Sequence, residues 1–110
     1  MSNPITLERI FTKGTLETRN FAMDFTDVLE PTETISTIDV EEQTTAALTV
    51  TLEAVNTTPI VVNRKKCETG KGVTFRISGG VAKVRYKLKA TIVTSASQTI
   101  TRFFYMDVVA

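Results

Sequence analysis

The sequence has no histidine, no tryptophan and only one cysteine, Cys67. A single thiol cannot form an internal disulfide, so the hydrophobic core must hold the fold together. Without histidine, the commonest acid–base catalyst and zinc ligand is missing. Apolar runs stay well short of the ~20 residues that cross a membrane, and the first residues lack the basic-then-apolar pattern of a secretory signal. We therefore expect no catalytic centre, no metal or cofactor site and no membrane contact.

Charge of one sign is also not in excess. Thirteen Lys and Arg residues face twelve Asp and Glu residues, and the net charge of +1 gives no overall attraction to nucleic acid. The 110 residues, of which 42% are hydrophobic and 20 are threonine, suit a single β-rich globular domain. Residues 1–13 contain Pro4 and show no clean hydrophobic period. We interpret them as an extended N-terminal arm, followed by one domain over residues 14–110.

Alternating apolar and polar residues predict seven strands within that domain. The clearest is 84–93, where one face carries Val84, Tyr86, Leu88, Ala90 and Ile92 and the other carries Arg85, Lys87, Lys89 and Thr91. The other expected strands are 16–25, 34–40, 44–54, 60–62, 73–77 and 98–109. Turns between closely spaced strands favour an all-β sandwich over an α/β fold, which needs helices between its strands.

Three local features refine this prediction. Ile35 and Ile38 break strict alternation, which predicts a β-bulge between them. In the strand that follows, we expect Leu48, Val50, Leu52 and Ala54 to point inward. Residues 41–47 are compatible with either strand or helix, because Glu-Glu-Gln-Thr-Thr-Ala-Ala contains fair helix formers.

Tyr86 follows the Gly79-Gly80 turn by a few residues and shares its strand face with apolar neighbours. A tyrosine in this position is typical of the corner in immunoglobulin-like sandwiches, where its hydroxyl binds the backbone a few residues upstream. We predict a structural corner formed by Tyr86, Gly79 and Gly80, with positive φ at the glycines.

The last strand is apolar on both faces towards its end, which indicates either a central strand or a face that contacts another subunit. One face carries Ile100, Phe104, Met106 and Val108, and the other carries Phe103, Tyr105 and Val109. The candidate partner interface combines this second face with the apolar residues of the arm: Phe103, Tyr105, Val109, Ile5, Leu7, Ile10 and Phe11.

Two further features bear on chemistry. Residues 63–71 are predicted to form a polar loop that carries the cations Arg64, Lys65, Lys66 and Lys71. Cys67 lies among them, and neighbouring cations lower a thiol pKa, but with no histidine base we expect an incidental surface thiol. A stripe of cations from Lys83 to Lys89 suggests contact with phosphates. No aromatic residue interleaves with it, so nucleic-acid binding is not expected. Because exposed charges are often neutral in effect, a solvated face is favoured over a docking surface for an acidic partner.

Several short motifs occur in an order that resembles a family of small tailed-bacteriophage proteins. They are Phe11-Thr12-Lys13, Phe21-Ala22-Met23-Asp24-Phe25-Thr26-Asp27-Val28-Leu29, Thr34-Ile35-Ser36, Ile77-Ser78-Gly79-Gly80, Tyr86-Lys87-Leu88 and Thr91-Ile92-Val93-Thr94-Ser95. The resemblance implies an immunoglobulin-like virion structural protein without enzymatic activity, which is made in the cytoplasm of a bacterial host. It would dock in the tail or neck and join a fibre or collar to the particle; the alternative is a capsid decoration protein on the head shell. Its partners would be other virion proteins of the tail, neck, fibre or capsid, contacted by multiple copies in a symmetric particle.

Overall fold

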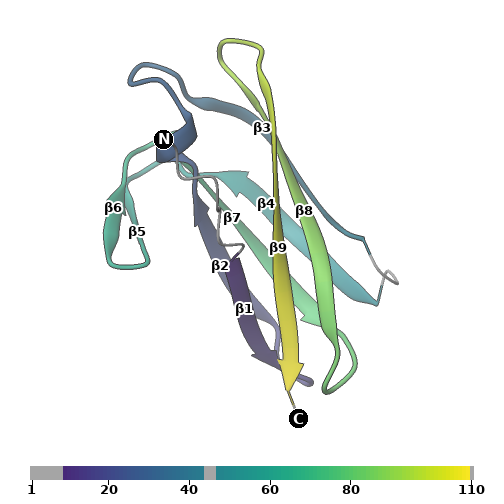
Figure 1. The fold of residues 1–110 in the computed structure, drawn as a ribbon. Coiled ribbons are helices and arrows are strands. Elements are labelled where there is room, and N and C mark those ends of the chain that lie inside the picture. The colour runs from purple at the N-terminus through teal and green to yellow at the C-terminus, as the bar shows by residue number, and fades with distance from the viewer. Residues whose placement is uncertain (1–8, 44–46, 110) are drawn as a thin grey trace, which may run out of the picture.

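The computed structural model describes residues 9–43 and 47–109, and these residues form nine β-strands and one short 3₁₀ helix, without any α-helix (Figure 1). The strands are β1 (Arg9–Gly14), β2 (Arg19–Asp24), β3 (Ile35–Glu42), β4 (Leu48–Val55), β5 (Ile60–Val62), β6 (Lys65–Cys67), β7 (Gly72–Gly79), β8 (Arg85–Thr94) and β9 (Thr99–Val109), and the 3₁₀ helix is Thr26–Val28. The prediction of an all-β fold is confirmed.

The strands form two larger sheets and a separate hairpin. One sheet has the order β1-β9-β8-β3, the second has the order β2-β7-β4, and β5 pairs with β6. Every pairing is antiparallel except that of β1 with β9, which is parallel. The two larger sheets contribute to one hydrophobic core, an arrangement that is compatible with the predicted sandwich.

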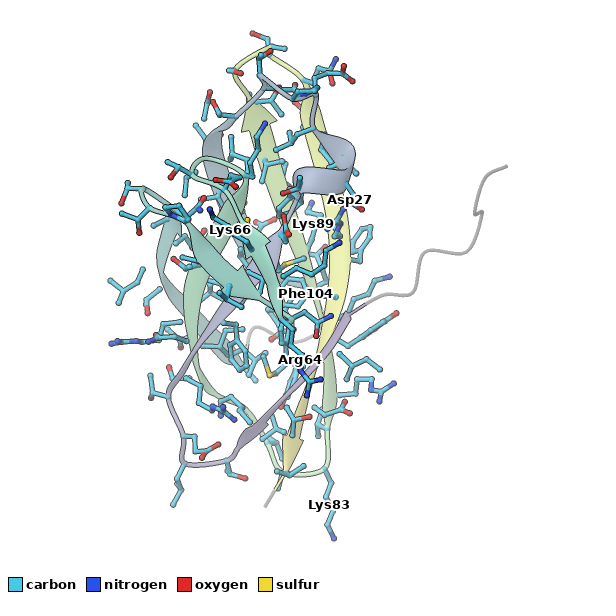
Figure 2. The ribbon with its side chains drawn as sticks, turned by 90° about the vertical axis from the view of Figure 1, so that its left-hand side faces the viewer. Asp27, Arg64, Lys66, Lys83, Lys89 and Phe104 are labelled. Carbon is cyan, nitrogen blue, oxygen red and sulfur yellow. The ribbon has the colours of Figure 1, made fainter. Side chains whose placement is uncertain are left out.

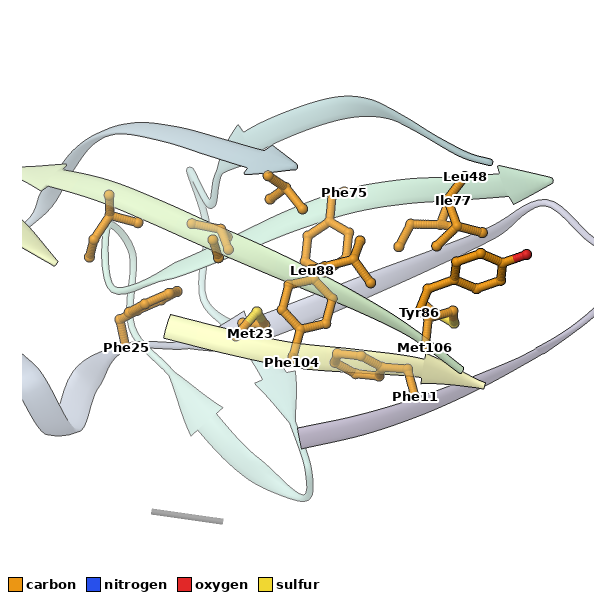
Figure 3. Close-up of a cluster of buried hydrophobic side chains, with 14 of the residues drawn as sticks. Phe11, Met23, Phe25, Leu48, Phe75, Ile77, Tyr86, Leu88, Phe104 and Met106 are labelled. Atoms are coloured by element: carbon orange, nitrogen blue, oxygen red, sulfur yellow. The ribbon is translucent and has the colours of Figure 1, made fainter. Parts of the chain in front are cut away.

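Aromatic rings connect the sheets at the centre of this core (Figure 3). The Phe104 ring of β9 lies 5.4 Å from that of Phe75 on β7 and 5.6 Å from that of Phe11 on β1. Such pairs contribute about 0.5–1.5 kcal/mol each beyond the burial of their area. The strand alternation directs these residues inward, and the expected inward set of β8 is confirmed, since Tyr86, Leu88, Ala90 and Ile92 are all buried.

The bulge in β3 is also confirmed, since the register with β8 shifts between Ile35 and Thr37. A second bulge was not expected. The register of β4 with β7 shifts between Thr51 and Ala54, so the prediction that Leu52 and Ala54 point inward is wrong. Leu52 has φ of 54° and is 65% exposed. The shift reverses the pleat, and Val55 packs on the core instead.

The predicted strand list omits two strands. Arg9–Gly14, assigned to the arm and to the first residue after it, forms β1, because it pairs with a strand at the other end of the chain. Lys65–Cys67, expected in a polar loop, forms β6. The remaining residues of the predicted arm, 1–8, lie outside the described residues, as do 44–46 of the open segment 41–47; the segment's first two residues belong to β3.

Candidate docking surface

β9 is a central strand, so its second apolar face forms the middle of the outer surface of the four-stranded sheet. Because Phe104 and Met106 are buried, Phe103 and Tyr105 point away from the core. The register places Tyr105 between Ile10 on β1 and Lys87 on β8. Ile10 is 47% exposed, and the two aromatic residues are half-buried. We call Ile10, Phe103 and Tyr105 the outer patch.

Cations border the outer patch. The Lys87 ammonium lies 4.6 Å from the centre of the Phe103 ring, and the Arg85 guanidinium lies 5.8 Å from that of Tyr105. Contacts of this kind stabilise a cation over a ring by about 0.5–1 kcal/mol at exposed sites. The patch therefore combines aromatic area with positive charge, a composition that is common at protein–protein interfaces.

Acids on neighbouring strands pair with two cations of the basic stripe. Arg85 donates to both carboxylate oxygens of Asp107, at 2.6 and 2.9 Å, and this pairing lowers the pKa of the Asp107 carboxyl. The Lys89 ammonium lies 3.7 Å from a carboxylate oxygen of Glu41. Lys83 projects from the far tip of the molecule, whereas Arg64 and Lys66 lie on the β5–β6 hairpin (Figure 2). The described cations thus do not form the continuous positive surface that phosphate binding favours.

The structure brings only some of the predicted interface residues together. Val109 lies on the same face as Phe103 and Tyr105, at the end of β9, and is 46% exposed. Phe11 is 8% exposed and belongs to the core, because the pleat of β1 turns Ile10 outward and Phe11 inward. Ile5 and Leu7 lie outside the described residues.

Tyr86 lies at one end of the core, with its hydroxyl at the margin of the cluster (Figure 3). The Val81 N–H donates to this hydroxyl at 2.7 Å, and Gly79 and Gly80 have φ of 85° and 97°. A Cβ on Gly80 would lie 2.8 Å from Cγ2 of Val108, so the turn also needs glycine for space. This geometry is what a corner requires, and the stabilising role of Tyr86 stays a prediction.

Replacing Tyr86 by phenylalanine is expected to lower the free energy of unfolding by about 1 kcal/mol, because one net hydrogen bond is lost and the Val81 N–H loses its acceptor. Urea denaturation followed by circular dichroism measures this change. Tyr105→Phe is the matched control, since its hydroxyl is not in the core. An unchanged unfolding midpoint for Tyr86→Phe would exclude a stabilising corner.

A buried lysine reinforces the same end of the molecule, and sequence reasoning missed it. Lys13 is 1% exposed, and its ammonium donates to the carbonyls of Gly14 and Gly79, each at 2.7 Å. Burial lowers the pKa of this ammonium. Lys13 thereby ties the end of β1 to the end of β7. A lysine at an inward position of an edge strand was the only signal that pointed to this contact.

The prediction of a surface thiol at Cys67 is wrong. Cys67 is fully buried, and its Sγ lies 3.3 Å from Oδ1 of Asp24. Burial, together with the Asp24 carboxylate, raises the pKa of the thiol to about 11. The neighbouring cation Lys66 pairs with Glu68 at 3.6 Å instead. A protonated, buried thiol is a poor nucleophile, so the hypothesis of an enzyme that acts through Cys67 loses its structural basis.

Asn56 and Lys71 are buried polar residues that organise the loops around the β5–β6 hairpin. The Asn56 side chain donates to the carbonyls of Thr58 and Glu68, and its oxygen accepts from the N–H groups of Gly70 and Gly72. The Lys71 ammonium donates to the carbonyls of Glu30, Pro31 and Glu33. Lys71 ends the segment 63–71 that was expected to be a polar loop, but its side chain is buried, because three backbone carbonyls take the place of water around the ammonium.

Two further features are absent from the described part of the chain. No group of three or more Cys, Asp and Glu residues is placed to hold a metal ion within residues 9–43 and 47–109. In the same ranges, no helix is long and apolar enough to cross a membrane.

These features define an all-β domain whose most distinctive surface is an exposed aromatic patch on a sheet, as in proteins that work by contact with other proteins. The chain belongs to the family described as podophage GP4 fiber-tail adaptor protein gp77, whose family model matches residues 13–107. No curated protein and no solved structure matches the chain. The predicted resemblance to phage virion proteins is confirmed, and the family indicates a structural component that docks at the phage tail. It gives no support to the alternative of capsid decoration.

Proposed function

We propose that the chain is an immunoglobulin-like, non-enzymatic adaptor that docks in the tail or neck of the virion and joins a fibre or collar to the particle. Its partners are other virion proteins, and it acts in multiple copies after synthesis in the bacterial cytoplasm. The family match over residues 13–107 supports the tail location. Several copies in a symmetric tail would let weak single contacts add to a firm attachment.

The strand arrangement supports the immunoglobulin-like part of this proposal. Among the described residues, the two larger sheets contain seven strands, and the β5–β6 hairpin is an insertion between β4 and β7. The hydroxyl of Tyr86, near the start of β8, binds the backbone of Val81, five residues upstream. Immunoglobulin-like domains have a tyrosine corner at the equivalent turn between the two sheets.

The observation that carries the docking proposal is the outer patch with its cationic border. Phe103 and Tyr105 are large aromatic residues on the outer face of a central strand, and both are only half-buried there. Aromatic residues and arginine dominate the binding energy of protein interfaces. We therefore assign the contact with the tail or fibre to this patch, with Val109 at its margin.

Phage particles assembled with a Phe103→Ala, Tyr105→Ala double variant are expected to incorporate at least about 30-fold less adaptor, which corresponds to about 2 kcal/mol lost from central aromatic contacts. The variant is supplied from a plasmid to a phage that lacks the gene, and adaptor and fibre are quantified in purified particles. The isolated variant should stay folded, with a loss of stability of no more than about 2 kcal/mol from the two cation–ring contacts, since both side chains point away from the core.

Leu52→Ala is the control for this experiment, because Leu52 is 65% exposed on the other sheet. It should be incorporated normally. Normal incorporation of the double variant would contradict the assignment of the outer patch. Density for the protein on the head shell, instead of the tail or neck, would contradict the adaptor role itself.

A further inference from the structure

A groove runs between β1 and β2, the edge strands of the two sheets, and the β5–β6 hairpin forms one of its walls. Its lining includes Ile10 and Thr12 from β1, Asn20 and Ala22 from β2, and Val61 from the hairpin. Val61 is 73% exposed and Ile10 is 47% exposed. The groove therefore presents apolar side chains together with two strand edges.

The backbone of β1 faces this groove at every second residue. Thr15 N–H donates to the Val109 carbonyl at 2.9 Å, which sets the phase of the parallel ladder. In that phase the odd-numbered residues bind β9, and the N–H and C=O groups of Ile10, Thr12 and Gly14 point away from it. Both backbone groups of Gly14 have partners within the β1–β2 turn. Among the described residues, the Thr12 carbonyl has only a long contact of 3.4 Å with Arg19.

Within residues 9–43 and 47–109, the facing edge of β2 is likewise not paired with another strand. Phe25 N–H donates to the Lys71 carbonyl at 2.8 Å, which places the odd-numbered residues of β2 in the ladder with β7. The backbone groups of Asn20 and Ala22 then point to the groove. At the end of β2, the Arg102 guanidinium donates to the Asp24 carbonyl at 2.9 Å, so this carbonyl is not available to an added strand. Open edges of this kind bind an extended chain through main-chain hydrogen bonds.

We propose that this groove binds residues 1–8 of a neighbouring copy of the same chain as an added β-strand. The proposal rests on the proposed function, in which several copies assemble in one tail, and it adds how those copies contact each other.

The sequence of the segment fits the groove. Ile5 and Leu7 are two residues apart, so an extended segment would direct both to the apolar lining. Arg19 is the only charged residue among the described residues that line the groove. Glu8 points to the opposite face of an extended segment from Leu7, so its charge attracts Arg19 from the rim of the groove and stays out of the apolar lining. The eight residues span about 26 Å when extended, enough to follow the edge of β1. Pro4, which cannot donate to a ladder, marks the end of the paired part.

A neighbour's segment fits better than the chain's own. The segment runs directly into Arg9, the first residue of β1. To lie against its own β1 it would need a hairpin turn, and even a tight turn uses two residues. That turn would remove Leu7 and Glu8 from the strand. Exchange between copies uses a different surface on each partner and closes into a ring when the rotation allows it.

Two full-length variants test this exchange. Ile5→Asn, Leu7→Asn changes the segment and leaves the groove intact, whereas Val61→Asp puts a negative charge in the groove and leaves the segment intact. By sedimentation equilibrium the unmodified chain should self-associate, and each variant alone should do so at least tenfold more weakly. An equimolar mixture of the two variants should form one-to-one dimers, because one intact groove meets one intact segment. Val81→Asp, at a valine that is 59% exposed in the β7–β8 turn, should behave like the unmodified chain.

A synthetic peptide of residues 1–8 adds a direct measurement. Fluorescence anisotropy should show saturable binding of the labelled peptide to the Ile5→Asn, Leu7→Asn chain. A peptide methylated on the backbone nitrogens of residues 5–7 keeps every side chain but cannot donate to a strand edge, and it should bind at least tenfold more weakly.

Equal binding of both peptides, no binding up to millimolar concentration, or monomeric unmodified chain would each overturn the proposal. If the groove binds a segment of another virion protein instead, particles should assemble normally with the Ile5→Asn, Leu7→Asn variant. That result would also overturn the proposal. None of these results affects the incorporation test of the outer patch, so failure here leaves the adaptor role standing.

Discussion

Asn56→Ala is expected to lower the free energy of unfolding by about 3 kcal/mol. The Asn56 oxygen accepts from the N–H groups of Gly70 and Gly72, both at 3.0 Å, and Asn56 is 7% exposed. Each buried donor that loses its acceptor costs roughly 1–3 kcal/mol. Alanine leaves the Gly72 N–H without an acceptor, while the Gly70 N–H keeps the Asn56 backbone carbonyl, also at 3.0 Å. The carbonyls of Thr58 and Glu68 lose their donor as well, and relaxation of the loop recovers only part of the total cost. Urea denaturation followed by circular dichroism measures the change.

The neighbouring Thr57→Ala is the matched control and should change stability by less than about 0.5 kcal/mol, because Thr57 is exposed. Asn56→Asp separates the hydrogen bonds that the Asn56 side chain accepts from those that it donates. An aspartate keeps the acceptor for the glycine N–H groups but faces the carbonyls of Thr58 and Glu68 with another acceptor. It should therefore also destabilise the protein. A loss below about 0.5 kcal/mol for Asn56→Ala would show that water replaces the amide without cost.

Lys71→Met is expected to lower the free energy of unfolding by about 2–3 kcal/mol. The ammonium donates to the Glu30 and Pro31 carbonyls at 3.0 Å and also to that of Glu33. Hydrogen bonds from a charged donor contribute roughly 1.5–3 kcal/mol each before the cost of burying the charge is subtracted. Methionine keeps the length of the apolar stem, but the three carbonyls belong to the backbone and stay where they are.

Lys66→Met is the control, because Lys66 lies on the exposed hairpin and its pair with Glu68 is open to water. Such pairs contribute about 0–1 kcal/mol. Hydrogen exchange adds a local readout, since amide protection in residues 26–35 should fall more than protection in β8. If Lys71→Met were as stable as the unmodified protein, the gain from burying methionine would equal the loss of the three hydrogen bonds, and the ammonium would have no net structural role.

Period-two alternation was sufficient to predict most of the fold. It identified the inward face of β8 and, through the spacing of Ile35 and Ile38, the bulge in β3. Alternation failed at Leu52. The sequence of β4 alternates regularly through this residue, so it gives no sign of the bulge that reverses the pleat there. Alternation also failed for β1, whose partner β9 is distant in the chain.

The candidate surface was predictable in part for the same reason. Phe103 and Tyr105 share a strand face, and their outward position follows from the inward position of Phe104. Whether Ile10 or Phe11 joins them depends on the phase of β1, which only the pairing with β9 determines. The buried roles of Lys13 and Lys71 could not be predicted, because they depend on where backbone carbonyls point after folding.

The parallel pairing of β1 with β9 determines how the domain resists a mechanical force that is applied to the ends of these two strands. Both strands point the same way, and β1 runs beside the second half of β9, from Arg9 opposite Phe104 to Gly14 opposite Val109 (Figure 1). A pull along the long axis, applied at Arg9 and Val109, would load the whole row of hydrogen bonds between the two strands in shear, since these bonds lie across the direction of the force. The bonds would have to break together instead of opening one after another. In a part that links a fibre to a tail, this geometry would let the attachment resist drag on the fibre without any covalent cross-link.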